Sequence, residues 1–492
     1  LRAWAIEEAD IPEWLYRESR DTVGDSAETI ALLLPRVEST IDTPFHELVE
    51  RELLPLRGSD EAEQRRAVTE AWSQLDYSGR LVYNKLITGS FRVGVSQQLV
   101  LRALSQISEL PVDVLAHRAM GEWEPTPEFF TGLLSPHDEE HEAPIARPYP
   151  FHLAHPLESE AADLGSIDEW QAEWKWDGIR SQVIKRAGEV FIWSRGEDLI
   201  TERFPELAEA AAELPDGTVL DGEILPWMDE RVLPFTELQR RIGRKNVTAK
   251  ILAEVPVILQ AYDIIEHGGA DIREFPFADR RSLLIDILAE QNGGPLRVTD
   301  AVDAASWVDL ARLRDTSREL GVEGFMLKRR GSPYRTGRHR GDWWKWKIDP
   351  LTIDAVLIYA QKGTGKRANL FTDYTFGVWR DEELVPFAKA YSGLTDAEIA
   401  RLTEHFHETT LEVRGHLHLV QPTIVLEVAF DSIQRSTRHD SGFSLRFPRI
   451  ARIRDDKSPD QIDTLETCRR MAESMSTPAP PGERACTALE FR

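Results

Sequence analysis

Cysteine is almost absent from this sequence of 492 residues, which contains only Cys468 and Cys486. Two cysteines are too few for a disulfide framework or for a zinc site of four cysteines. No stretch of about 18 consecutive apolar residues is present, so a membrane-spanning helix is not expected. The first residues lack a basic region followed by an apolar run, so no secretory signal is predicted. These absences favour a cytoplasmic location.

Net positive charge is also missing, since the formal net charge is −25. Such acidity is unusual for a protein that binds nucleic acid, and it is also explained by solubility or a saline habitat. The charge is uneven, however, because residues 328–347 contain only one acidic side chain. Eight basic residues share that segment: Lys328, Arg329, Arg330, Arg335, Arg338, Arg340, Lys345 and Lys347. A focused basic stretch within an acidic exterior is compatible with a polyanionic ligand.

Lysine is scarce as well, with 12 lysines among the 59 basic residues. The chain uses arginine almost wherever a cation suffices, so each remaining lysine hints at a task that arginine cannot perform. Nucleophilic attack is such a task, because an amine can lose its proton and a guanidinium in effect cannot.

The length and the sequence pattern predict a multidomain chain. Residues 1–135 are expected to be an all-α domain, because segments 27–40 and 96–110 have apolar residues at helical spacing. Residues 136–149 contain prolines and a charge run, which is typical of a linker. In residues 150–349, short β-rich runs alternate with helical ones, which predicts an α+β domain.

The last part of the chain is expected to be a small β-barrel with a closing helix. Residues 350–476 contain several strand candidates with one helix among them, which fits a barrel. The closing helix is predicted to begin with Ser458 as its cap and Pro459 at its first position. Residues 477–492 are rich in proline and are predicted to be a flexible tail.

One lysine lies in a pattern that suits attack on phosphorus. The run from Glu173 to Arg180 reads EWKWDGIR and falls between two β-like runs, so Lys175 is expected on a loop. An amine beside cationic groups can lose its proton and act as a nucleophile. Asp177 and Gly178 favour a tight turn, and Arg180 can hold ribose or phosphate. Alone, the pattern fits a surface turn equally well.

Further segments in the same order give this lysine a context. They are Ser194-Arg195-Gly196, Asp221-Gly222-Glu223, Ala261-Tyr262-Asp263, Glu323–Lys328, Trp343–Lys347 and Arg454–Lys457. Together with the lysine loop they resemble the nucleotidyltransferase motifs of covalent polynucleotide ligases and mRNA capping enzymes. Residues 83–104 resemble the helical DNA-binding domain of ATP-dependent DNA ligases. The chain is therefore similar to ATP-dependent DNA ligases over most of its length.

The resemblance implies a site for ATP. It implies that Lys175 is the nucleophile that carries AMP, that Glu173 contacts the adenine edge and that Tyr262 stacks on the ring. Arg180 and Arg195 are implied to hold ribose and phosphate. A core position for Tyr262 is the alternative to stacking.

The resemblance also implies a metal and a set of phosphate contacts. Glu223 and Glu323 are implied to hold Mg²⁺ near the α-phosphate, with Glu223 also near the ribose; exposed strand-end carboxylates are the alternative. The residues implied to grip phosphates are Lys328, Lys345 and Lys347. Those implied to orient pyrophosphate from an OB-fold barrel are Arg454, Asp456 and Lys457, for which a solvated charge run is the alternative.

The function implied is the ATP-dependent sealing of nicks between a 5′-phosphate and a 3′-hydroxyl in duplex DNA, as in replication, repair and recombination. Lysyl-AMP and then DNA-adenylate would be the intermediates. Lys85 and Arg92, near two glycines, are predicted to contact DNA phosphates in the minor groove; a helical scaffold without a ligand is the alternative. A monomer is expected. A hinge is predicted near Asp349-Pro350, because the barrel is useful only while pyrophosphate leaves.

Other readings of the sequence remain open. An RNA ligase or a guanylyltransferase shares the lysyl-nucleotide chemistry, and a non-catalytic protein that binds nicks would share the fold. Segment 363–366 only partly matches a phosphate-binding loop, because Arg367 replaces the expected Ser or Thr. The pattern at 137–141 mimics a zinc site but falls in the predicted linker. The histidine pairs 405/407 and 416/418 are predicted to be structural.

Overall fold

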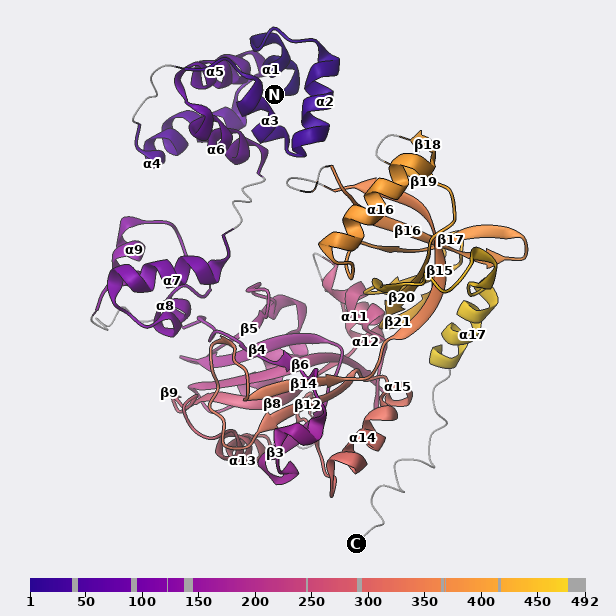
Figure 1. Ribbon diagram of the computed structural model, residues 1–492. Coiled ribbons are helices and arrows are strands. Elements are labelled where there is room, and N and C mark those ends of the chain that lie inside the picture. Colours follow the sequence, from indigo (N-terminus) through magenta and orange to yellow (C-terminus); the bar gives the residue numbers. More distant parts are fainter. Residues whose placement is uncertain are drawn as a thin grey trace. The chain divides into compact units, whose positions relative to one another are not determined.

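The computed structural model in Figure 1 is described by ranges of the chain. These ranges are residues 1–37, 43–89, 95–121, 123–136, 145–244, 247–289, 294–363, 367, 369–414 and 417–476. Two compact units are present among the described residues: one contains Leu1–Val95 and residues 350–476, and the other contains Ser96–Asp349. The prediction for Arg92, and those for segments 364–366 and 137–141, fall outside the described residues. Among the described residues, no helix combines the length and the apolar character that crossing a membrane requires.

The chain before residue 136 is helical wherever it has regular structure among the described residues. The helices are α1 (Arg2–Glu8), α2 (Glu13–Val23), α3 (Ser26–Leu33), α4 (Phe45–Glu47), η1 (Leu48–Leu53), η2 (Leu54–Gly58), α5 (Glu61–Gln74), α6 (Tyr77–Thr88), α7 (Gln97–Ser108), α8 (Val112–Arg118) and α9 (Pro127–Leu134). Segment 96–110 is thus helical over most of its length, whereas segment 27–40 is helical only as far as Leu33. α3 ends before Pro35, and Leu34 is extended, as expected for a residue that precedes proline. The helices up to α6 and those from α7 belong to different compact units.

The first sheet of the unit Ser96–Asp349 has the strand order β10-β8-β6-β4-β5, with β7 beside β6 and β9 beside β8. Its strands are β4 (Ile179–Arg186), β5 (Glu189–Ser194), β6 (Thr218–Met228), β7 (Arg231–Val232), β8 (Val257–His267), β9 (Ala270–Asp271) and β10 (Leu296–Val298). The helices of this part are α10 (Pro205–Ala212), α11 (Phe235–Ile242), α12 (Ala249–Glu254) and α13 (Phe277–Leu288). One face of the sheet packs on α10, α11 and α13 through a core that includes Leu220, Leu259 and Ala261.

The second sheet of this unit has the order β11-β3-β12-β14-β2. Its strands are β2 (His155–Pro156), β3 (Trp170–Trp174), β11 (Ala301–Val302), β12 (Gly324–Arg329) and β14 (Trp343–Lys347), and a separate parallel pair is β1 (His152–Leu153) with β13 (Gly337–Arg338). The helices that follow β11 are α14 (Trp307–Asp315) and α15 (Ser317–Leu320). Trp170, Ala172 and Leu327 pack with α14, which covers one face of this sheet.

The remaining faces of the two sheets meet each other. A cluster of buried side chains joins Ile184, Val219 and Ile265 of the first sheet to Trp343 of the second. Because side chains alternate along a strand, the residues next to those of the two outer cores line the space between the sheets. We call this space the cleft, and it is defined by the inward side chains of β6 and β8 on one side and of β3, β12 and β14 on the other.

The region from Pro350 forms a seven-stranded sheet and a two-stranded one with two α-helices (Figure 1). Its elements are β15 (Leu351–Lys362), β16 (Phe371–Arg380), β17 (Glu383–Ala390), α16 (Asp396–Thr409), β18 (Thr410–Arg414), β19 (Leu417–Val420), β20 (Val425–Phe430), β21 (Ser432–Arg435), β22 (Phe443–Arg446), β23 (Arg449–Ile453) and α17 (Leu465–Ser476). Strand β15 pairs with β16 on one side, and on the other with β20 and then β19. We call this part the C-terminal region.

One element of the C-terminal region differs from the prediction. The closing helix was expected to start at Ser458, but this residue caps a short 3₁₀ turn, Pro459–Gln461, and α17 begins at Leu465. The cap signal itself is present, because Ser458 and Gln461 form a reciprocal capping box. Asp463 instead bonds the backbone of Asp354, which ends the turn and directs the chain back across the sheet.

Candidate active site

Lys175 lies directly after β3, on the loop that the sequence predicts. Its backbone N–H donates to the carbonyl of Gly324 at 2.8 Å, and its carbonyl accepts from the N–H of Glu323 at 2.9 Å. The turn that follows is tightly packed, because a Cβ on Gly178 would lie 2.3 Å from the carbonyl oxygen of Ile224. The lysine backbone is therefore fixed between β12 and the turn.

The side chain of Lys175 faces two carboxylates that the sequence singled out. Its Nζ lies 2.7 Å from Oε2 of Glu323, and Nζ of Lys347 lies 3.2 Å from the same oxygen. Burial raises the pKa of Glu223 to about 7, although the charges of Lys175 and Arg180 act in the opposite direction. Glu223 also accepts from the N–H of Gly178 at 3.2 Å. Lys175 is thus paired with Glu323, and its charge acts on Glu223, whose carboxylate is desolvated by burial.

Asp221 organises one side of the cleft, a role that the sequence did not reveal. Its buried carboxylate accepts from Nη2 of Arg180 at 2.7 Å and from the hydroxyl of Tyr334 at 2.7 Å. The hydroxyl of Tyr262 lies 3.3 Å from its other oxygen. Arg180 also donates to the carbonyl of His152 at 2.6 Å. The Asp221 carboxylate thus holds both Arg180 and Tyr262 in place. In the sequence, only its position two residues before Glu223 pointed to this residue.

Glu173 is the centre of a buried charged cluster on the other side of the cleft. Its carboxylate lies 2.7 Å from Nζ of Lys328, and both side chains are at most 2% exposed. Nε2 of Gln171 donates to it at 2.7 Å. The Lys328 ammonium also lies 4.1 Å from the centroid of the Tyr262 ring. Lys328 is therefore grouped with Glu173 and Tyr262, the residues predicted to contact the base, and is paired with carboxylate here.

The remaining predicted cations of this unit are more exposed. Lys345 is paired in register with Met326 and Pro156. Burial and then the charges of Arg338, Lys347 and Lys175 lower its pKa, so it lies in a field of positive charge. Arg195 is exposed, and its backbone N–H donates to the carbonyl of Arg180 at 2.9 Å. An arrangement of cations with so few acidic partners suits a polyphosphate.

The predicted residues of the C-terminal region form an ion-pair cluster of their own. Nη1 of Arg454 lies 2.9 Å from Asp354, and its Nη2 lies 2.8 Å from Asp456. Lys457 pairs with Asp354 as well. Side-chain hydrogen bonding to Asp456 is the largest of the effects that raise the pKa of Arg454. These side chains are therefore occupied by partners within their own region.

Two remaining predictions concern DNA and metal contacts. Lys85 is mostly buried on α6, and its Nζ lies 2.9 Å from Asp25, so it already has a carboxylate partner. Within the described ranges, no group of three or more His, Cys, Asp or Glu side chains is arranged to hold a metal ion. Of the predicted histidine pairs, His418 contacts the ring of Phe371 and His405 lies 3.2 Å from the hydroxyl of Thr423.

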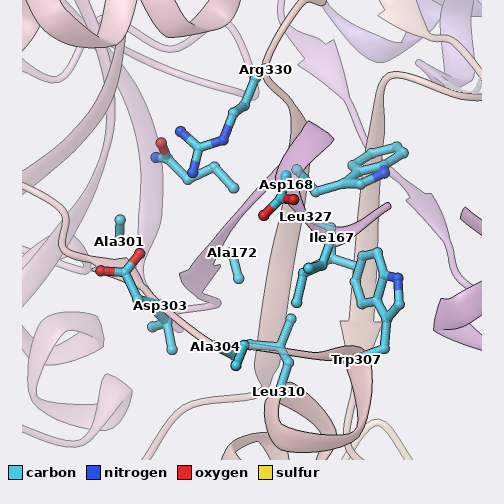
Figure 2. A pocket seen from close by; sticks show the side chains of 14 residues that line it. Ile167, Asp168, Ala172, Ala301, Asp303, Ala304, Trp307, Leu310, Leu327 and Arg330 are labelled. Carbon is cyan, nitrogen blue, oxygen red and sulfur yellow. The ribbon is translucent and has the colours of Figure 1, made fainter. Parts of the chain in front are cut away.

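A separate cavity of about 280 Å³ opens on the α14 side of the second sheet (Figure 2). Ala172, Leu310, Leu327 and Trp307 line it, and Arg330 stands at its rim. None of the residues predicted for catalysis or nucleotide binding lines this cavity. The side chains of residues 173–347 that the sequence predicts to act on a nucleotide gather in the cleft instead.

Comparison with known proteins explains this arrangement. Residues 152–347 match the family described as "ATP dependent DNA ligase domain", and residues 367–457 match "ATP dependent DNA ligase C terminal region". A protein of Koribacter versatilis named "Probable DNA ligase" is 38% identical over 418 residues, which cover 79% of this chain and 71% of that protein. This chain belongs to the ATP-dependent DNA ligase family.

Other relatives extend the comparison. A "Probable DNA ligase" of Opitutus terrae is 38% identical over 457 residues, which cover 79% of this ligase-family chain. The chain spans only 44% of the length of that relative. The solved structure named "Pmar-Lig_PreS3" has a TM-score of 0.60 at 16% identity and covers 92% of this chain and 94% of its own, a similarity of fold alone. The ligase family thus accounts for a nucleotidyltransferase domain and an OB-fold domain of mixed helix and sheet content.

Proposed function

We propose that this chain seals nicks between a 5′-phosphate and a 3′-hydroxyl in duplex DNA, with AMP carried on Lys175. The observation that supports this most directly is Nζ of Lys175 within 2.7 Å of Glu323, at the end of a cleft that holds the other motif residues. In step one the lone pair of the lysine nitrogen attacks the α-phosphorus of ATP, and the bond to the leaving pyrophosphate breaks. In step two AMP moves to the 5′-phosphate, and in step three the 3′-hydroxyl attacks and expels AMP.

Release of Lys175 from Glu323 is the first requirement of step one. The lysine must attack phosphorus as a neutral amine, so it must lose a proton as well as its ion pair. Lys345 and Lys347 supply positive charge on the adjacent strand, and they would also hold the phosphates of ATP. Because charge spreads over the phosphate oxygens in the transition state, such fixed cations contribute most of the rate enhancement. Arg195 would add a contact to ribose or phosphate from an exposed position.

Glu323 and Glu223 fit a Mg²⁺ ion that arrives with ATP. They flank Lys175 from opposite sheets, and carboxylate oxygens are hard ligands. Mg²⁺ generally takes one or two carboxylates together with substrate phosphates and water, so a larger acidic cluster is not needed. When bound, the ion would neutralise developing charge on the α-phosphate. Loss of the Lys175 partner would leave the Glu323 carboxylate available for this role.

The adenosine part of ATP would lie deeper in the cleft. Tyr262 offers a ring fixed by Asp221, and Glu173 offers a carboxylate fixed by Lys328 and Gln171. A base stacked on the ring would bring its amino group toward that carboxylate. Arg180, also fixed by Asp221, would contact ribose or the α-phosphate.

The C-terminal region would act in step one only. Arg454 and Lys457 would orient the leaving pyrophosphate after the region turns about a hinge near Asp349-Pro350. Their ion pairs with Asp354 and Asp456 would be exchanged for phosphate oxygens. The Asp456 carboxylate is 67% exposed, so exchange of that partner costs little free energy. Asp354 is only 11% exposed, so its exchange for phosphate needs an equally close anionic partner. This region is proposed to be an OB-fold barrel.

The helical part before residue 136 is proposed to bind the duplex. Lys85 would give up or share Asp25 to reach a phosphate, and Arg92 would contact the backbone nearby. The protein is proposed to act as a cytoplasmic monomer.

One assay tests the proposal. Wild type and Lys175→Ala are incubated with radiolabelled ATP, Mg²⁺ and a nicked duplex, and both protein labelling and sealed product are measured. Wild type is expected to become labelled and to seal the nick, and the variant to do neither. Labelling by GTP in place of ATP would favour a guanylyltransferase, and sealing only of RNA ends would favour an RNA ligase. A wild-type protein that binds nicks without becoming labelled would be a non-catalytic binder.

A further inference from the structure

Two buried polar atoms beside the cleft have no hydrogen-bond partner among the described residues. They are Nη1 of Arg281 and Oε1 of Gln260. The residues are 7% and 8% exposed, so solvent does not satisfy these atoms. Almost all buried polar groups in proteins have a partner, and an exception calls for an explanation. A ligand that enters the cleft is one such explanation, because it can supply both missing partners.

Gln260 faces the cleft from the same side of the sheet as Glu223. It is paired across the sheet with Glu223, and paired residues on neighbouring strands point to the same side. Its neighbours Leu259 and Ala261 point into the helix-covered core on the opposite face. The amide of Gln260 therefore lies on the wall of the cleft, near Tyr262 on the same strand.

Arg281 reaches the cleft from α13. One end of its guanidinium donates to the carbonyl of Thr299, which fixes its position. Its free Nη1 lies 3.6 Å from Oε1 of Glu173, too far for a hydrogen bond. The two Glu173 oxygens are already bound, Oε2 by Lys328 and Oε1 by Gln171. Arg281 thus brings a donor beside Glu173, whose partner Lys328 contacts the ring of Tyr262. Gln260 brings an acceptor two residues from Tyr262 along β8.

We propose that Arg281 and Gln260 recognise the edge of adenine in the ATP that Lys175 attacks, a role that rests on the proposed function. Adenine carries an amino group flanked by ring nitrogens N1 and N7, which accept hydrogen bonds. Nη1 of Arg281 donates to one of these nitrogens. Oε1 of Gln260 and the Glu173 carboxylate accept from the amino group. In guanine a carbonyl oxygen replaces that group and meets two other oxygens, so GTP is rejected.

Two ATP analogues test the arginine contact. In 1-deaza-ATP and 7-deaza-ATP a C–H replaces one ring nitrogen, and kcat and KM for lysine adenylation are measured with wild type and Arg281→Met. Wild type is expected to lose about 10- to 100-fold in kcat/KM with one of the two analogues, the value of a hydrogen bond from a charged donor. Arg281→Met is expected to lose the same factor with ATP and nothing further with that analogue.

A structural role for Arg281 would give a different result. Its contact with Thr299 makes some loss of stability expected in Arg281→Met, but misfolding would affect ATP and both analogues equally. The proposal would be overturned if Arg281→Met lost a further factor in kcat/KM with the same deaza analogue that wild type uses poorly. A wild-type enzyme that uses both deaza analogues within about twofold of ATP would also overturn it, a result that needs no variant.

Gln260 is tested with a nucleotide that lacks the 6-amino group, purine riboside triphosphate. Gln260→Leu is expected to slow adenylation by ATP and to narrow the preference of the enzyme for ATP over this analogue. An unchanged preference would remove Gln260 from the proposal. For Arg281→Met the matched control is Arg312→Met, because Arg312 is exposed on α14 and pairs with Asp309.

The outcomes separate this inference from the proposed function. If wild type forms no lysyl-AMP with ATP, the proposed function fails. If it does, and Arg281→Met shows multiplying losses with both deaza analogues, only the base-reading role fails.

Discussion

The charged residues of the cleft and those of the C-terminal region are organised differently. In the cleft, Glu173 and Lys328 are paired out of contact with water, and Asp221 is fully buried against Arg180. In the C-terminal region, Arg454 pairs with Asp354, whose side chain is 11% exposed, and also with Asp456, whose side chain is 67% exposed. A buried charge cannot lose its partner without a large cost, whereas an exposed one exchanges its partner easily. The cleft is therefore suited to hold one geometry, and the exposed pair of Arg454 with Asp456 is suited to engage and release.

The strongest test of this difference is Asp221→Asn. The substitution keeps the shape but leaves the Arg180 guanidinium buried without its counter-charge. We expect the free energy of unfolding to fall by about 3–5 kcal/mol, the range for a broken buried ion pair. Urea denaturation of the two proteins measures it. A loss below about 1 kcal/mol would mean that the cleft charges are no more constrained than surface pairs.

The second test displaces the loop of the nucleophile. A methyl group at Gly178 would lie 2.7 Å from Cδ2 of Leu225 and closer still to the carbonyl of Ile224, so Gly178→Ala must move the turn. Because a shift of about 1 Å in an active site can cost about 100-fold in rate, we expect lysine adenylation to slow by that factor. Gly331→Ala is the matched control, since no atom lies within 4 Å of its added Cβ. Equal rates in both variants would show that the turn does not position Lys175.

The third test concerns the packing of His117, on α8, against Tyr149. The ring of His117 stacks on Tyr149 at 4.6 Å, and burial, followed by the charges of Arg273 and Arg147, lowers its pKa to about 4. The unfolded chain therefore takes up the proton first as the pH falls, with a pKa near 6.5. The contribution to stability is complete above pH 6.5 and is lost as the pH falls toward 4.

Between pH 6.5 and 5 this linkage corresponds to about 2 kcal/mol. Denaturant titrations at several pH values should show a steeper loss of stability in wild type than in His117→Gln over that range. If the free energy of unfolding falls equally with pH in the two proteins, His117 is not the cause of the loss.

The smallest effect is expected at the exposed pair in the C-terminal region. Asp456→Asn removes a partner of Arg454, but Asp354 and Glu427 still lie near the guanidinium. We expect the thermal midpoint to stay within about 2 °C of wild type. A shift as large as that of Asp221→Asn, measured by calorimetry, would contradict the contrast between the two regions.

The sequence predicts the residues around the nucleophile better than the residues that hold the cleft side chains in place. Lys175, Glu323 and Lys347 are brought together as expected, because each lies at the end of a strand that the motifs mark. The roles of Asp221 and Gln260 depend on how β6 pairs with β8, including an irregular register near Tyr262, and no local pattern encodes that pairing. Those details follow only from the packed sheets.

Other predictions show the same limit. The capping box at Ser458 is real, yet it closes a single turn, because Asp463 is drawn to the backbone of Asp354 about a hundred residues away. Lys85 carries a charge that the sequence assigns to DNA, but tertiary packing gives it Asp25 as a partner. The domain bounds, the hinge and the DNA contacts stay predictions.

The central claim is that the cleft serves every step while the C-terminal cluster serves only the first. Arg454→Ala tests it in two assays on one preparation: labelling of Lys175 by ATP, and sealing of a nick that already carries AMP. We expect labelling to slow by at least about 10-fold, as for loss of a charged contact, and sealing of the adenylated nick to stay within about twofold of wild type. Equal slowing of both reactions would contradict the account.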